Sequence, residues 1–115
     1  MRVFIAGPYG DRNPKAVIAQ NVAIANHVAR DLMASGHQVF CPHTMSWGWE
    51  DDTRLNEDQF KALGMTFLRL WAEAIIRIPG RSGGADAEMN EARRLGLVEL
   101  PFPPAAPPDI VGVPG

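Results

Sequence analysis

Residues 2–10 have the sequence RVFIAGPYG, in which an apolar run ends at a turn that contains glycine and proline. Such a run predicts a buried strand over Arg2–Ala6. Between Pro14 and Ser35, apolar residues recur every three or four positions, which predicts a helix. A short apolar stretch at 38–41 predicts a second strand, because a helix of this length suits a right-handed crossover between parallel strands. The first part of the chain therefore predicts one βαβ unit.

The rest of the chain repeats this alternation. Apolar residues of 57–71 cover more than one stripe, which predicts a helix buried on two sides, as a contact between identical chains would explain. Residues 43–56 have no clear period, so a long loop is expected there. A strand, a helix and a fourth strand are expected over Ala74–Ile78, Ala85–Leu95 and Leu97–Leu100. This order predicts a small α/β fold, flavodoxin-like or Rossmann-like, with three layers and an open, mainly parallel four-stranded sheet.

The composition is that of one globular domain. The chain has 115 residues, of which 46% are apolar and 21% are charged. We expect the domain to span residues 1–100. Six of the last fifteen residues are proline, which predicts a mostly disordered, proline-rich tail over 101–115.

Charge and cysteine content narrow the partners and the compartment. Eleven basic and thirteen acidic residues leave a net charge of −2, which argues against a nucleic acid polymer as partner. Cys41 is the single cysteine, and the apolar run at the start is too short for a signal peptide or a membrane span. We therefore expect a cytoplasmic protein with no membrane partner. Cys41 and the three histidines lack the paired spacing of zinc ligands, so neither a metal site nor a cofactor is expected.

Two glycine-rich loops are the candidates for a binding site: Gly7-Pro8-Tyr9-Gly10 and Pro79-Gly80-Arg81-Ser82-Gly83-Gly84. Ligands of open parallel sheets bind beyond the carboxyl ends of the strands where the winding reverses, so the two loops are expected to face each other across one crevice. Glycines let a ligand approach the backbone, and the N–H groups that open a helix suit a phosphate or another oxyanion. The spacing matches neither the P-loop nor the dinucleotide-binding fingerprint, which argues against an ATPase or a dehydrogenase. The alternative is that both loops are ordinary turns.

Glu88 lies six residues after Ser82, about one turn into the expected helix. Its carboxylate can therefore point into the same crevice as the amides of the loop. The alternative is that Asp86 and Glu88 are present because acids stabilise a helix N-terminus, and the spacing alone favours this alternative.

Aromatic side chains and one histidine are further candidates for contact with a ligand. Tyr9, Trp47 and Trp49 have faces on which a base can stack, although packing in the core or in an interface explains the two tryptophans equally well. His43 follows the second strand and can bind or protonate a leaving base near neutral pH, whereas most single histidines only satisfy local hydrogen bonds.

Three motifs occur in the order of a known superfamily: Phe4-Ile5-Ala6-Gly7-Pro8-Tyr9, then Pro79-Gly80-x-Ser82-x-Gly84-Ala85-x-x-Glu88, then Ala92-x-x-x-Gly96. On these motifs the chain resembles the nucleoside 2-deoxyribosyltransferase-like superfamily, over roughly Arg2–Leu100. It looks closest to the small single-domain members. Its Ser-to-Glu spacing is similar to that of the deoxynucleoside 5′-monophosphate N-glycosidases.

The resemblance implies cleavage or transfer at the N-glycosidic bond of a (deoxy)nucleoside 5′-monophosphate. Glu88 would be the catalytic residue, which attacks the anomeric carbon or stabilises an oxocarbenium-like transition state. The resemblance also implies an oligomer, by default a homodimer, in which a neighbour completes the site. It assigns the 5′ phosphate to Ser82, Gly83, Gly84 and Ala85, and the base and sugar to Gly7, Pro8 and Tyr9.

The chain departs from the superfamily pattern at two positions. Members usually carry aspartates around the positions of Thr66 and Ala74, and neither aspartate is present here. Glu73 is adjacent to one of these positions and is a candidate replacement. No spacing favours it over the other candidates, which are Glu50, Asp51, Asp52 and Asp58.

Three functions therefore stay open. The first is an enzyme that cleaves or transfers at the N-glycosidic bond of a small nucleoside or nucleotide. The second is a catalytically degenerate nucleotide-binding module, favoured by the two missing aspartates. The third is an interaction protein that uses the apolar helix of 57–71 and the proline-rich tail.

Overall fold

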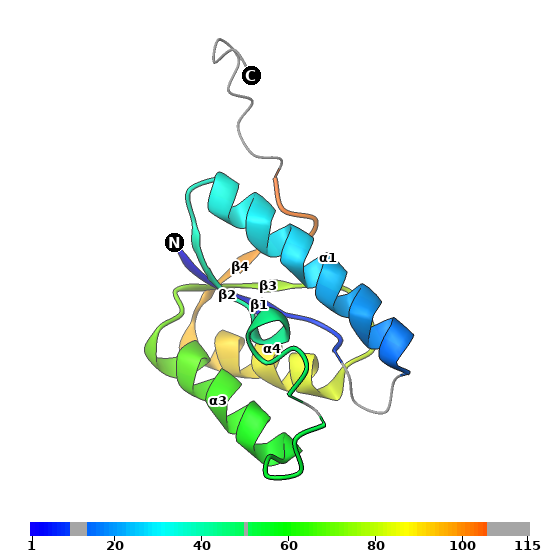
Figure 1. The fold of residues 1–115 in the computed structure, drawn as a ribbon. Coiled ribbons are helices and arrows are strands. Elements are labelled where there is room, and N and C mark those ends of the chain that lie inside the picture. The colour runs from blue at the N-terminus through cyan, green and yellow to red at the C-terminus, as the bar shows by residue number, and fades with distance from the viewer. Residues whose placement is uncertain (10–13, 50, 106–115) are drawn as a thin grey trace, which may run out of the picture.

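The computed structural model describes residues 1–9, 14–49 and 51–105. All neighbouring strands pair in parallel, in the order β2-β1-β3-β4. Helix α1 covers one face of this sheet, and α3 and α4 cover the other (Figure 1), so the expected three-layer α/β fold is confirmed. The elements are β1 (Arg2–Ala6), α1 (Lys15–Ala34), β2 (Gln38–Phe40), α2 (Pro42–Met45), α3 (Glu57–Leu70), β3 (Ala74–Arg77), α4 (Gly83–Leu95) and β4 (Val98–Leu100).

Strand β1 lies inside the sheet, with both of its faces covered. Val3, Phe4 and Ile5 are fully buried. Successive residues of a strand point to opposite faces, so Val3 and Ile5 pack with α1, whereas Phe4 packs with α3 and α4. This double coverage explains why β1 is a continuous apolar run in the sequence and not an alternating one.

The strand order places the carboxyl ends of β1 and β3 side by side. Phe4 pairs with Ile75, and Ala6 pairs with Arg77. The connections leave toward opposite faces, because β1 continues into α1 and β3 continues into α4 (Figure 1). This is the switch point at which open parallel sheets bind their ligands.

Helix α4 begins at Gly83, two residues before the start that we expected at Ala85. Its N-cap is Ser82, whose Oγ accepts a hydrogen bond from the backbone N–H of Ala85 at 3.1 Å. Glycine has a low helix propensity, so the sequence pattern does not reveal that Gly83 and Gly84 are helical. As a consequence, Glu88 lies in the second turn of α4.

The connection between β2 and α3 contains a helical turn that the sequence pattern missed. Helix α2 starts at Pro42, a residue that suits the first position of a helix. The expectation of a loop over 43–56 is therefore wrong for its first three residues. Four residues are too few to show a period, which is why the pattern gave no signal.

Helix α3 is less buried than its apolar pattern predicts. Its N-cap is Asn56, which forms a reciprocal capping box with Gln59. Gly64 and Leu68 are buried, whereas Leu70 is 84% exposed. In the single chain α3 is thus buried on one side, and burial of its other side by a second copy stays a prediction.

Residues 101–105 leave the sheet without regular structure. The greater part of the expected tail, 106–115, lies outside the described residues, as do Gly10 and Glu50. Across residues 1–9, 14–49 and 51–105, no helix combines the length and the apolar character needed to cross a membrane.

Candidate active site

The two glycine-rich loops are in direct contact. A Cβ atom added to Gly80 would lie 2.5 Å from Cγ of Pro8, and one added to Gly7 would lie 2.9 Å from Cβ of Ile78. Gly80 also has a φ of +133°, which side chains rarely adopt. The loops that follow β1 and β3 therefore pack against each other at these residues, where an open crevice was expected.

The first loop is held in place by α1 and α2. Asn21 Nδ2 donates a hydrogen bond to the carbonyl oxygen of Tyr9 at 2.8 Å. His43 Nε2 lies 2.6 Å from the carbonyl oxygen of Pro8, and the ring of Tyr9 stands edge-on to the imidazole. Because a carbonyl oxygen only accepts hydrogen bonds, Nε2 must carry the proton there.

His43 is 3% exposed, and its burial lowers the pKa of the imidazole below the usual value. The ring is therefore neutral near pH 7. With the hydrogen on Nε2, the Nδ1 atom is an acceptor, and it is buried without a hydrogen-bond partner within the described residues. The hydrogen bond from His43 thus joins α2 to the Gly7–Tyr9 loop. The role of His43 toward a leaving base stays a prediction.

The second loop presents two backbone donors. The N–H groups of Gly83 and Gly84 make no hydrogen bond within the part of the chain that the structure describes. A Cβ atom added to either glycine would meet nothing within 4 Å, so the surroundings are open. The N–H of Ala85 differs, because it already donates to Ser82. Of the amides expected to hold a phosphate, those of Gly83 and Gly84 are the ones that are free to do so.

Glu88 extends from α4 toward α3 and β1. A Cβ atom added to Gly64 of α3 would lie 3.1 Å from Oε2 of Glu88 and 3.7 Å from the ring of Phe4. The carboxylate therefore lies against the backbone of α3, in space that any side chain at position 64 would take. Burial raises the pKa of Glu88 to about 7, and attraction to the guanidinium of Arg77 opposes this increase.

The thiol of Cys41 is close enough to the Glu88 carboxylate for the two groups to interact electrostatically. Burial is the main cause that raises the pKa of this thiol, and repulsion by the Glu88 carboxylate adds to it. The end of β2 therefore supplies an uncharged neighbour to the glutamate near pH 7. Within the described residues, no group of three or more His, Cys, Asp and Glu side chains can hold a metal ion.

Gly64 is a site residue that the sequence analysis missed. A glycine inside a helix costs about 1 kcal/mol relative to alanine, so its presence in α3 calls for a packing reason. Here the reason is the close approach of Glu88. The signal was present in the sequence, but nothing local says which side chain uses the space.

The two residues at the positions of the absent aspartates make structural contacts in this chain. Thr66 is exposed, and its hydroxyl donates to Ala62 within α3. Ala74 is fully buried and pairs with Val3 near the amino end of β3. Glu73 accepts a hydrogen bond from the Arg2 N–H at 2.9 Å, at the amino ends of β1 and β3 and so at the end of the sheet opposite to the loops.

The candidate role of Glu73 as a replacement for an absent aspartate is therefore wrong. Two of the other candidate acids have cationic partners of their own. Asp51 pairs with Lys15, and Asp52 binds Arg54.

Trp47 and Trp49 follow α2 and are each 46% exposed. Packing in the core of the single chain is thus not the reason for these two tryptophans. Stacking on a base and packing in an interface both stay open.

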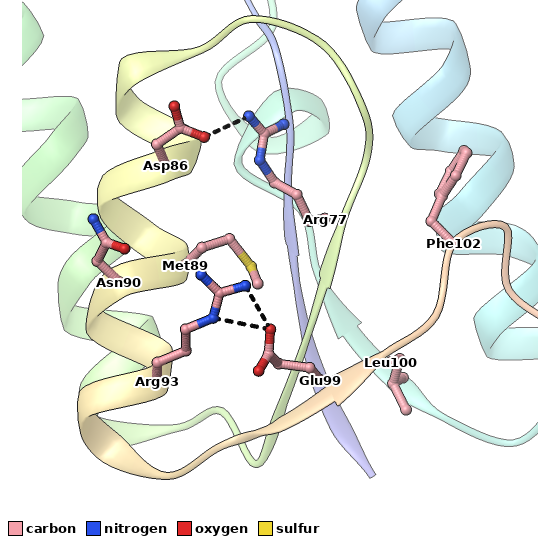
Figure 2. Close-up of a pocket in the computed structure, with 8 residues that line it drawn as sticks. All are labelled: Arg77, Asp86, Met89, Asn90, Arg93, Glu99, Leu100 and Phe102. Carbon is pink, nitrogen blue, oxygen red and sulfur yellow. Dashed lines mark hydrogen bonds and ion pairs between the residues drawn. The ribbon is translucent and has the colours of Figure 1, made fainter.

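An open cleft of about 580 Å³ lies on another side of α4 (Figure 2). Its α4 residues are spaced three and four apart, so they form one stripe of the helix, which does not contain Glu88. Ser82 is also absent from its lining. The residues that line the cleft are Arg77, Asp86, Met89, Asn90, Arg93, Glu99, Leu100 and Phe102.

No protein-family model and no curated protein sequence matches the chain. Among solved structures, the chain is similar to a 2-deoxyribosyltransferase from the psychrotolerant bacterium Bacillus psychrosaccharolyticus. The TM-score is 0.60 and the sequence identity 23%, over 87% of this chain and 70% of that chain. At this identity the likeness shows the fold, and it confirms the Rossmann-like α/β architecture derived from the sequence pattern.

Proposed function

We propose that this protein cleaves or transfers at the N-glycosidic bond of a (deoxy)nucleoside 5′-monophosphate, with Glu88 as nucleophile or oxocarbenium stabiliser. The observation that carries the proposal is the position of the Glu88 carboxylate. It lies against Gly64 of α3 and belongs to the helix whose first amides are free at Gly83 and Gly84. The fold shared with a 2-deoxyribosyltransferase supports the same reaction class.

The environment of Glu88 suits a reaction that generates positive charge. The raised pKa means that the ionised carboxylate is poorly solvated. A sugar that develops oxocarbenium character next to it supplies the missing positive charge, so the interaction is stronger in the transition state than with the neutral sugar. The neutral sugar of the ground state cannot form this interaction. Glu88 would therefore stabilise the transition state more than the ground state, which accelerates the reaction.

In the reaction, the bond between C1′ and the base nitrogen breaks, and the base leaves with the bonding electron pair and takes up a proton. Water or a second base then adds to C1′ and gives the free sugar phosphate or a new nucleotide. If Glu88 acts as nucleophile, an ester at C1′ forms first and is opened by the same acceptor. The helix N-terminus at Gly83 and Gly84 suits the 5′ phosphate.

The experiment compares the purified protein with its Glu88→Gln variant on a panel of ribo- and deoxyribonucleoside 5′-monophosphates. Free base is followed by chromatography, and binding is followed by calorimetry. We expect base release from the unmutated protein and loss of release in Glu88→Gln, with binding retained. Glu99→Gln is the matched control, because Glu99 is an exposed glutamate that pairs with Arg93. Equal release by the Glu88→Gln variant would contradict the role of Glu88.

A catalytically degenerate nucleotide-binding module is the second candidate function. It is favoured by Thr66 and Ala74, which stand where related proteins usually carry aspartates, and by Glu73, which is bound to Arg2 at the other edge of the sheet. This candidate predicts binding of a nucleotide with no release of base, with and without an added free base as acceptor. The same panel therefore separates the two functions.

A homodimer whose second copy completes the site is part of the proposal. The exposed Leu70 on α3 supports such a contact. Light scattering after size-exclusion chromatography tests it, with Leu70→Glu as the variant expected to shift a dimer to a monomer. A monomer at all concentrations would overturn this part alone.

A further inference from the structure

Arg77 is the last residue of β3, and its guanidinium reaches three acceptors. Nη1 donates to the carbonyl oxygen of Ile78, and Nη2 donates to the carbonyl oxygen of Gly80 at 2.9 Å. Nη2 also binds Oδ1 of Asp86, in the first turn of α4, at 2.9 Å. The side chain is only 20% exposed. One guanidinium therefore joins the beginning of the second loop to the helix in which the loop ends.

We propose that Arg77 is a positioning residue, which fixes the 79–84 loop and the start of α4 and thereby places Glu88 and the free amides of Gly83 and Gly84. This inference rests on the proposed function, in which those groups contact the substrate. Arg77 itself lies in the cleft on another side of α4, so it acts on the site through the loop and through its charge (Figure 2).

The contacts require an arginine. A guanidinium has five N–H donors in one plane, so it can bind two carbonyl oxygens and a carboxylate at once. A lysine ammonium carries the same charge but lacks this fixed geometry. The two properties of Arg77, its geometry and its charge, can therefore be separated by substitution.

The charge of Arg77 also acts on Glu88. The neighbours of this carboxylate are Gly64 of α3, Phe4 of β1, Cys41 after β2 and Arg77 of β3. Among them Arg77 is the cation, and its attraction lowers the pKa of Glu88 against the effect of burial. Removal of the charge should therefore leave more of Glu88 protonated at pH 7.

Arg93 offers a matched control. It lines the same cleft and binds Glu99 through Nε at 3.1 Å and Nη2 at 2.9 Å (Figure 2). None of its hydrogen bonds within the described residues reaches the 79–84 loop. Arg93→Gln thus removes a guanidinium and an ion pair from the cleft and leaves the loop contacts in place.

The test measures two quantities by NMR in the absence of any substrate: the titration of the Glu88 carboxyl carbon, and the hydrogen exchange of the Ala85 and Asp86 amides, which both donate to Ser82 at the end of the loop. Arg77→Gln should raise the pKa of Glu88 above its value of about 7. It should also speed exchange of these two amides about tenfold or more, as expected when hydrogen bonds to a charged group are lost and the start of α4 opens more often. Arg77→Lys should speed exchange but keep the pKa of Glu88 near that of the unmutated protein, and Arg93→Gln should change neither.

The proposal is overturned if Arg77→Gln and Arg77→Lys leave both quantities unchanged, or if Arg93→Gln changes them to the same extent. If Arg77→Gln does not fold, the comparison of Arg77→Lys with Arg93→Gln tests the proposal. Only Arg77→Lys should then speed hydrogen exchange of the Ala85 and Asp86 amides. Because both readouts are taken without substrate, they are independent of whether the protein releases base, and failure of the proposed function is distinguishable from failure of this inference.

Discussion

Glu88 and Glu91 lie three residues apart on α4, and their surroundings shift their acidities in opposite directions. Burial beside Gly64 raises the pKa of Glu88 to about 7. Hydrogen bonds from Arg94 and Arg69, both at 2.5 Å, lower the pKa of Glu91 to about 2. Both glutamates face α3: the carboxylate of Glu91 joins α3 to α4 through Arg69, whereas that of Glu88 carries a charge that is poorly compensated. An uncompensated charge that is shielded from water costs stability, so Glu88 is expected to destabilise the fold when it is ionised.

The largest expected effect of this difference is on stability. For Glu88, the pKa in the folded state is above the unfolded value of 4.5, so the folded state holds a proton more tightly. The destabilisation by this group is therefore absent below pH 4.5, grows as the pH rises, and is complete above about pH 7, where it reaches at most about 3 kcal/mol. Urea unfolding at pH 5 and pH 8 should show that Glu88→Gln is more stable than the unmutated protein at pH 8, with a smaller gain at pH 5.

Glu99→Gln serves as the control in those unfolding curves. An equal gain of stability in Glu99→Gln, or a gain in Glu88→Gln that does not depend on pH, would show that Glu88 is solvated like any surface glutamate.

The next effect concerns activity and pH. If the ionised carboxylate of Glu88 does the chemistry, base release at low substrate should fall about tenfold for each pH unit below about 7 and level off above it. The measurement is the pH dependence of kcat/KM on the best nucleotide of the panel. A rate that rises as the pH falls through 7 would instead assign Glu88 the role of a general acid.

Gly64→Ala tests the position of the Glu88 carboxylate with a smaller expected effect on activity. The new methyl group would lie 3.1 Å from Oε2 of Glu88, so the carboxylate must move by a few tenths of an ångström or more. We expect base release to fall by about tenfold. Stability should be unchanged or slightly increased, because alanine favours a helix by about 1 kcal/mol over glycine.

Thermal unfolding and base release are measured together on Gly64→Ala and on Thr66→Ala. Thr66 is an exposed residue of the same helix, so its substitution should leave base release unchanged. A loss of base release in both variants would mean that α3 is generally sensitive to substitution and that the space at Gly64 is not special.

The smallest effect on activity is expected for substitution of Glu91. Glu91→Gln removes the charge that pairs with Arg69 of α3 and Arg94 of α4. The Tm should fall because two guanidiniums lose their partner, and base release should be unchanged. Since the pKa of Glu91 is lowered, its contribution is present above pH 4.5 and is lost as the pH falls toward 2, which is opposite to Glu88. A Tm that does not fall at pH 7 would show that the ion pairs of Glu91 with Arg69 and Arg94 do not stabilise the packing of α3 against α4.

The fold was predictable from the sequence because its signals are local. The apolar run of β1 and the period of α1 each result from burial, and burial leaves a pattern in every element long enough to show one. The misses have the same origin. The four residues of α2 are too short for a period, and the glycines that open α4 carry no helix signal.

The candidate site was predictable only where its residues share one element. Ser82 is the N-cap of α4 and Glu88 lies in its second turn, so the spacing in the sequence placed both residues at the start of one helix. Gly64 and Arg77 were missed, because their importance arises from the approach of α3 to α4 and from the path of the loop after β3. Such relations between distant segments leave no period in the sequence.

The contact between Pro8 and Gly80 has a consequence for the order of folding. The two residues are far apart in the chain, so the loop after β1 cannot reach its final shape until β3 has docked beside β1. A nascent chain that ends before β3 lacks the segment against which Pro8 packs, even if β1, α1 and β2 have already assembled. The candidate site is thus expected to be among the last parts of the molecule to form during synthesis, because a chain that ends before Gly80 lacks half of this contact.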